Sequence, residues 1–260
     1  MKRVISKLAL LTFVIGIVFV NNSCEATFIK GNGILATSEK SVSEFEKINI
    51  SGSAEVRFYE SDEYRIVLTV DENLEKYVEI FTEGNTLRIK TKNGAYRFTK
   101  FLVEVYCPSS LTAVSLSGSG SFKGMDNIIT STFDATISGS GDMRGDVECT
   151  NYSAKISGSG SMRGNIVCQN FSSRISGSGE ISVTGSSTDA DITISGSGDF
   201  KGYEFNIKNA DINISGSGSA NVWVTDNLKA KISGSGNINY KGNPQVNSTI
   251  SGSGKIKNVN

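Results

Sequence analysis

The sequence predicts an all-β protein whose chain winds into a solenoid of stacked coils, each about 19 residues long. The phrase Ser-Gly-Ser-Gly occurs eight times between Ser117 and Gly254, at intervals of 18 to 21 residues. An aliphatic residue precedes every copy, and a second largely apolar position follows five residues after the first serine. A repeat of this length is too short for paired helices and fits the coil of a β-solenoid.

The segments between the copies alternate between apolar and polar residues, as strands do. In Asp191-Ile192-Thr193-Ile194, the β-branched isoleucines point to one face and the polar residues to the other. Equivalent residues of successive coils should then stack about 4.8 Å apart, and eight coils make a rod on the order of 40 Å long.

We interpret each Ser-Gly-Ser-Gly phrase as a corner of the coil. Strict alternation after an inward isoleucine aims both glycines at the interior and both serines at solvent, where the hydroxyls can satisfy neighbouring turn groups. Glycine lets the main chain turn sharply or approach another segment closely. The corner glycines are Gly118, Gly120, Gly139, Gly141, Gly158, Gly160, Gly177, Gly179, Gly196, Gly198, Gly216, Gly218, Gly234, Gly236, Gly252 and Gly254.

The phrase does not match a loop that binds phosphates, dinucleotides or calcium. Its commonest form, as over Gly139–Gly145, has one residue too many for the dinucleotide fingerprint, and no helix follows it. The residue after each copy varies among Ser, Asp, Glu, Asn and Lys, which excludes calcium at every coil. We therefore expect no cofactor and no metal site.

Composition narrows the classes of function. Lys plus Arg equals Asp plus Glu at 26 each, so nothing favours nucleic acid as a partner. Histidine is absent, which removes the Ser/His/Asp and Cys/His catalytic arrangements. The acids are scattered in coil position, so we expect no catalytic residue and no enzyme. A polysaccharide lyase or hydrolase stays open because β-helices also carry such enzymes. Amyloid-like assembly is a third possibility, although no ladder of Asn or Gln is expected.

The N-terminus predicts export and a lipid anchor. A basic start is followed by an apolar run over residues 8–20 and by Cys24, which resembles a bacterial lipoprotein signal. We expect residues 1–23 to be the signal peptide, Cys24 to be lipidated, and residues 24–43 to form a polar spacer. Ordinary cleavage without lipidation is the alternative. A lipid on Cys24 would place the protein in the cell envelope, anchored to the outer membrane and facing either the periplasm or the cell surface.

The repeated Ile-Ser-Gly-Ser-Gly, the opening Phe45–Ala54 and the strand Leu87–Lys90 resemble the putative auto-transporter adhesin, head GIN domain family. The resemblance covers residues 44–260, with irregular strands over 44–115 and regular coils over 116–260. It implies a right-handed, pectin-lyase-like single-stranded parallel β-helix without a recognised catalytic set, for which cell adhesion is a proposed role. We expect the irregular strands to share the solenoid core and to cap or flank its first coils.

Two sets of side chains beside the corners are candidate sites. Lys123, Arg144, Arg163 and Lys201 lie six residues after the start of their repeats and form either a solvated edge or a stripe that grips an anionic glycan. Trp223 alternates with Val222 and Val224, so it could face outward and be available for stacking; the alternative is a residue that covers the edge of the rod or makes an oligomer contact. The partner is thus expected to be a surface glycan or protein.

Cys149 and Cys168 lie nineteen residues apart, the interval of the repeat, so they should stack on neighbouring coils. Such a pair is an interior stack of thiols or a disulfide, which export to an oxidising compartment would permit.

Overall fold

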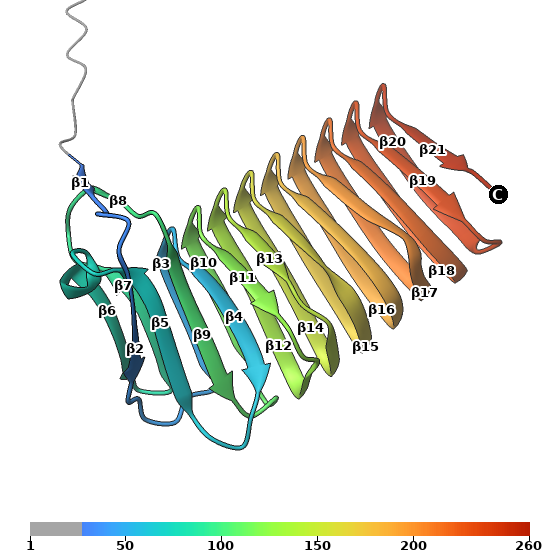
Figure 1. Cartoon of the computed structure of the whole chain (residues 1–260). Helices are drawn as coiled ribbons and strands as arrows, with labels where there is room; N and C mark the ends of the chain where they lie inside the picture. The colour runs from blue at the N-terminus through green and yellow to red at the C-terminus, as the bar shows by residue number, and fades with distance from the viewer. Residues whose placement is uncertain (1–27) are drawn as a thin grey trace, which may run out of the picture.

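The computed structural model describes residues 28–260, which form a rod of stacked parallel coils (Figure 1). The predicted all-β parallel solenoid is confirmed. The coil strands are β10 (Ala113–Gly118), β11 (Ser121–Gly124), β12 (Ile128–Gly139), β13 (Asp142–Arg144), β14 (Val147–Gly158), β15 (Ser161–Gly177), β16 (Glu180–Gly196), β17 (Asp199–Gly216), β18 (Ser219–Gly234), β19 (Asn237–Lys241), β20 (Gln245–Gly252) and β21 (Lys255–Asn258).

The register places equivalent residues of the repeats directly beside one another. Ile156 pairs with Ile175, and Ile175 pairs with Ile194 on the next coil. These isoleucines are buried, as is Phe200 in the second apolar row. The two predicted apolar ladders therefore form the core of the rod.

Each corner is closed by main-chain hydrogen bonds to the preceding coil. The N–H of Ser178 donates to Gly158 O and the N–H of Glu180 donates to Gly160 O, both at 3.0 Å. The first glycine of all eight copies has a φ between 115° and 129°, a conformation that favours glycine. The main chain, rather than the serine hydroxyls, thus satisfies these turn groups, contrary to the expectation from sequence.

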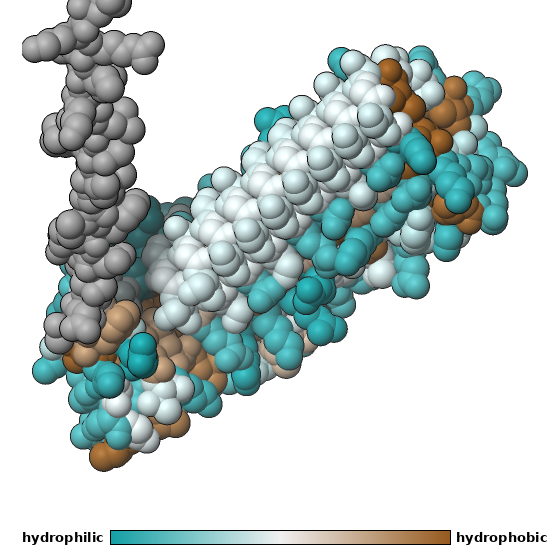
Figure 2. Space-filling model, turned by 90° about the horizontal axis from the view of Figure 1, so that it is seen from above, coloured by the Kyte–Doolittle hydropathy of each residue, from teal (hydrophilic) through white to brown (hydrophobic). Residues whose placement is uncertain are grey.

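The two glycines of a corner have different tasks, so the prediction that both point inward is wrong for the first. Gly177 is exposed at the turn, whereas Gly179 is buried. A Cβ on Gly177 would lie 2.5 Å from Gly158 O, and one on Gly179 would lie 2.5 Å from Ile156 Cγ2. The stacked corners form the pale strip along the rod in Figure 2, a surface of serine and glycine without charge.

Replacing a corner glycine should therefore destabilise the rod. We expect Gly177→Ala and Gly179→Ala each to lower the free energy of unfolding by about 1–3 kcal/mol, because the added methyl group meets the preceding coil. Ser176→Ala, at an exposed position of the same corner, should change it by no more than about 0.5 kcal/mol. Urea denaturation of the three variants checks this, and equal midpoints would contradict it.

The N-terminal part continues the solenoid and ends in antiparallel strands. Its strands are β1 (Ile29–Lys30), β2 (Leu35–Lys40), β3 (Lys47–Gly52), β4 (Glu55–Glu60), β5 (Arg65–Asp71), β6 (Val78–Glu83), β7 (Thr86–Thr91), β8 (Tyr96–Arg97) and β9 (Phe101–Cys107), with one 3-10 turn, η1 (Glu75–Tyr77). β3 pairs with β10 and β4 with β11, both in parallel. One cluster of buried apolar residues extends from Phe45 to Ile238.

The spacer expected up to residue 43 is wrong from Ile29 onward. β2 pairs antiparallel with β5 over its whole length, from Leu35 opposite Asp71 to Lys40 opposite Ile66. Cys24 lies outside the described residues. Within residues 28–260, no helix is long and apolar enough to cross a bilayer.

A buried carboxylate fastens this N-terminal segment. Asp71 has no exposed surface and accepts hydrogen bonds from the N–H groups of Gly33 at 3.0 Å and Thr99 at 2.7 Å. Burial alone would raise the pKa of Asp71, but the hydrogen bonds from Thr99 and Gly33 hold it below its ordinary value. Asp71 thus joins Gly33 to the loop before β9.

Asp71→Asn should loosen this fastening in a pH-dependent way. Because the pKa of Asp71 is lower in the folded chain, its stabilisation is full above the unfolded-state pKa of about 4 and is lost as the pH falls through the folded-state value. The melting temperature of the wild type should exceed that of Asp71→Asn by a constant gap at neutral pH, and the gap should narrow below about pH 4. A gap that stays constant under acid would contradict this account.

Candidate binding groove on the rod

The predicted basic stripe exists as a row of exposed side chains. Lys123, Arg144 and Arg163 are in register on successive coils, and the row continues through Ser182 to Lys201. Glu180 lies between two of the cations, 2.5 Å from Lys201 Nζ and 3.9 Å from an Arg163 nitrogen. Exposed pairs of this kind contribute little to stability. Binding of an anionic glycan to this row stays a prediction.

Trp223 faces outward near that row. The residue is 38% exposed, and its main chain is in register with Asn206 and Lys241 on the neighbouring coils. It is therefore free to contact a partner, and its role stays a prediction.

The three cysteines of the described residues carry free thiols inside the rod. Cys107 and Cys168 are buried and Cys149 is half-buried. Burial raises the pKa of the Cys149 thiol to about 12 and also raises that of Cys168, whose sulfur lies 3.6 Å from Ser187 Oγ. The geometry resembles an interior stack more than a reactive pair.

Thiol counting tests this arrangement. Protein prepared without reductant and then unfolded should show three reactive thiols besides Cys24, and the native protein should react slowly, because little thiolate forms at neutral pH. A single reactive thiol besides Cys24 would contradict this arrangement, because a disulfide between Cys149 and Cys168 leaves only Cys107 free.

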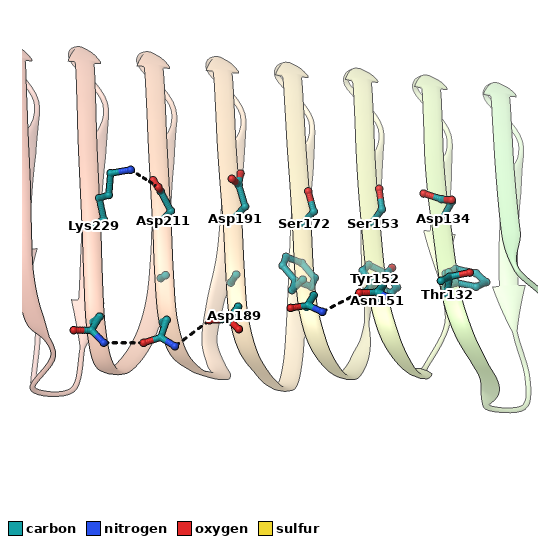
Figure 3. Close-up of a pocket in the computed structure, with 17 residues that line it drawn as sticks. Thr132, Asp134, Asn151, Tyr152, Ser153, Ser172, Asp189, Asp191, Asp211 and Lys229 are labelled. Atoms are coloured by element: carbon teal, nitrogen blue, oxygen red, sulfur yellow. Dashed lines mark hydrogen bonds and ion pairs between the residues drawn. The ribbon is translucent and has the colours of Figure 1, made fainter.

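The structure also shows a groove that the sequence did not predict, on the face formed by β12 and β14 to β18 (Figure 3). Its volume is about 700 Å³. Two rows of outward side chains border it along the rod axis. The amide row is Thr132, Asn151, Asn170, Asp189, Asn209 and Asn227, and the acid row is Asp134, Ser153, Ser172, Asp191, Asp211 and Lys229.

The amide row is a hydrogen-bonded ladder, which corrects the expectation that no asparagine ladder exists. Asn170 Nδ2 donates to Asn151 Oδ1 at 2.9 Å, and Asn227 Nδ2 donates to Asn209 Oδ1 at 2.8 Å. Asn209 donates in turn to Asp189 at 2.9 Å. An ionised carboxylate cannot donate a hydrogen bond, so the ladder ends at Asp189. The side-chain oxygen of Asn170 and the carboxylate of Asp189 are therefore both acceptors on neighbouring coils, and no hydrogen bond joins them.

The acid row has an excess of negative charge. Asp211 accepts from Lys229 Nζ at 2.6 Å and from Asn213 at 2.9 Å. This contact with Asp211 raises the pKa of Lys229. Asp191, on the neighbouring coil, accepts only a longer bond of 3.3 Å from Thr193.

The expectation that the acids are scattered is therefore wrong for this face. Four aspartates line the groove: Asp134, Asp189, Asp191 and Asp211. They are strung along the axis, and within residues 28–260 no three acidic or cysteine side chains come close enough together to hold a metal ion.

Between the two rows the groove is lined by inward-pointing apolar residues. Phe133, Tyr152 and Phe171 are only 3%, 8% and 2% exposed, and their rings stack on one another with centroids 5.8 and 5.5 Å apart. Such rings have no free face for a sugar or an aromatic ligand. The polar groups that the groove offers to a ligand therefore come from its two rows, whose four aspartates and single lysine favour hydrogen-bond donors over anions.

These features define a β-solenoid with an extended groove along one face. The sequence matches the family described as "Putative auto-transporter adhesin, head GIN domain" over residues 44–165 and 154–244, and the chain belongs to that family. Membership indicates a surface-interaction role and a location at the cell surface or envelope.

Solved structures share the whole rod. A putative adhesin from Parabacteroides merdae is 30% identical, with a TM-score of 0.86 over 90% of this chain and 99% of that one. A putative lipid binding protein from Parabacteroides distasonis is 33% identical, with a TM-score of 0.85 over 89% of this chain and 99% of that one. A putative adhesin from the same species is 29% identical, with a TM-score of 0.85 over 89% of this chain and 100% of that one. The curated proteins contain no match.

Proposed function

We propose that this protein is a lipid-anchored, non-enzymatic adhesin of the cell envelope that binds its partner along the groove of β12 and β14 to β18. The observation that carries this proposal is the groove itself, which continues over six coils between two rows of hydrogen-bonding side chains. A flat strand face would offer no such enclosure, and an extended partner can bind several coils at once.

The arrangement of charges supports binding rather than catalysis. General acid–base chemistry needs groups held together around one reacting bond. Here Asp211 accepts from Lys229 and Asp189 accepts from Asn209, so each of these two carboxylates is held by a neighbour in its own row.

The position of the groove also supports an adhesive role. The proposed anchor, Cys24, precedes β1 at one end of the rod, whereas the groove begins at β12 and extends to β18 toward the other end (Figure 1). A tether at β1 therefore leaves the groove accessible to a partner outside the membrane. The neighbours named as adhesins support the same role.

The proposal predicts that blocking the groove abolishes binding. Asp191→Arg places a long cation in the acid row, and Glu148→Arg makes the same exchange at an exposed acid of β14 outside the groove. For a partner found in a screen of glycans and surface proteins, Asp191→Arg should weaken binding at least about tenfold, or about 1.4 kcal/mol. Glu148→Arg should bind like the wild type.

Equal binding by both variants, with unchanged melting temperatures, would contradict the assignment of the groove. Equal loss in both would indicate a non-specific effect of charge and would contradict it as well.

A second candidate function is degradation of a polysaccharide. Asp191 and Asp211 are in register on neighbouring coils, whose main chains lie about 4.8 Å apart along the rod, and retaining glycosidases also use a pair of neighbouring carboxylates. Release of reducing ends from a bound glycan, abolished by Asp191→Asn, would support this candidate over the adhesin.

A further inference from the structure

Exposed apolar side chains gather where the chain enters the rod. Within residues 28–260, eleven large apolar side chains are exposed, and four of them lie in the eight residues 28–35, here called the strap. They are Phe28 (44% exposed), Ile29 (40%), Ile34 (58%) and Leu35 (46%). Figure 2 shows apolar surface at this end of the molecule. A concentration of this kind marks a surface that contacts something other than water.

Basic side chains stand beside these apolar ones. β1 pairs with β8, which sets Ile29 beside Tyr96 and Lys30 beside Arg97. The Arg97 guanidinium lies 5.1 Å from the centre of the Phe28 ring. Apolar and aromatic groups flanked by lysine and arginine are typical of surfaces that rest on anionic membranes.

The strap is held in place, so its apolar side chains do not fold back onto the rod. Asp71 binds Gly33, and the N–H of Asn32 donates to Asn73 Oδ1 at 3.0 Å. Asn73 Nδ2 also donates to the carbonyl of Lys30 at 2.8 Å. The apolar groups are therefore presented outward by an ordered main chain.

We propose that the strap and β8 form a membrane-contacting face, whose apolar side chains enter the bilayer interface while Lys30 and Arg97 contact lipid headgroups. This inference rests on the proposed lipid anchor. Four residue steps separate Cys24 from Phe28, and they span at most about 14 Å. A lipid on Cys24 thus keeps the strap at the membrane surface, where side chains of amphipathic segments are buried about 5–10 Å. A bilayer is for this reason a better occupant of the face than a protein partner.

The test uses the full chain with its own leader, produced in a bacterium that processes lipoproteins. A polarity-sensitive dye is attached to Ile34→Cys in isolated envelope membranes, and Ile129→Cys serves as the control because Ile129 is 54% exposed on β12. The unsubstituted chain, with its three interior thiols, gives the background labelling. We expect the dye at position 34 to emit at shorter wavelength and to be quenched by nitroxide-labelled lipids, whereas the dye at position 129 is not.

The other outcomes separate the inference from the proposed function. A chain that stays with the membranes but whose dye at position 34 behaves like the one at 129 would overturn the membrane-contacting face and leave the anchor intact. A dye that is shielded from water but not quenched by the lipids would show that a protein covers the strap, which also overturns the inference. A chain found only in the soluble fraction would overturn both the anchor and the face.

Discussion

The stacking of the corners is the constraint on which the rest of the structure depends. The main-chain N–H groups of each corner donate hydrogen bonds to carbonyl oxygens of the corner before it. The Ser197 N–H donates to Gly177 O at 2.9 Å, and the Ser178 N–H donates to Gly158 O at 3.0 Å. Carbonyl oxygens of one corner lie where the Cβ atoms of the next would be, so only glycine permits this approach. Because every coil starts from the same point, every column of side chains beside the corner is brought into register. The ladders inside the rod and the rows outside it both follow from this geometry.

Within that register, a large side chain at one position of the coil compensates for a small side chain at another. The inward row of aromatic residues ends at Phe171 and continues as Ala190 and Ala210, and here the buried rings of Phe200 and Phe205, from two other positions of the coil, pack against Phe171. The Phe171 ring lies 5.0 Å from the Phe205 ring, so the core stays filled. Outward rows are free of this packing requirement. They can therefore carry the charges and amides that line the groove of β12 and β14 to β18.

The fold could be predicted from sequence because the corner phrase and the isoleucine before it are local and recur. The groove was missed because positions were counted forward from each corner, where the coils differ in length. Counted back from the next corner, every member of the amide row lies six residues before the first serine and every member of the acid row lies four before it. Asn151 and Asn170 each follow the first serine of their corner by 13 residues, but Asn209 follows by 14 and Asn227 by 12. The coils absorb these differences at irregular positions, such as the shift between Ser182 and Thr184. Residues 29–40 were misinterpreted as part of a spacer because the pairing of β1 with β8 and of β2 with β5 lies outside the repeat and leaves no period in the sequence.

Hydrogen exchange at the corner amides tests the central claim most directly. The serine amides that donate across the corners, such as those of Ser178 and Ser197, belong to residues that are exposed. If these amides hold the coils in register, they should exchange only when coils separate, at rates as slow as those of the strand amides in the core. Exchange at the rate of an unprotected peptide, in a rod that is otherwise protected, would contradict the claim that the corners fix the register.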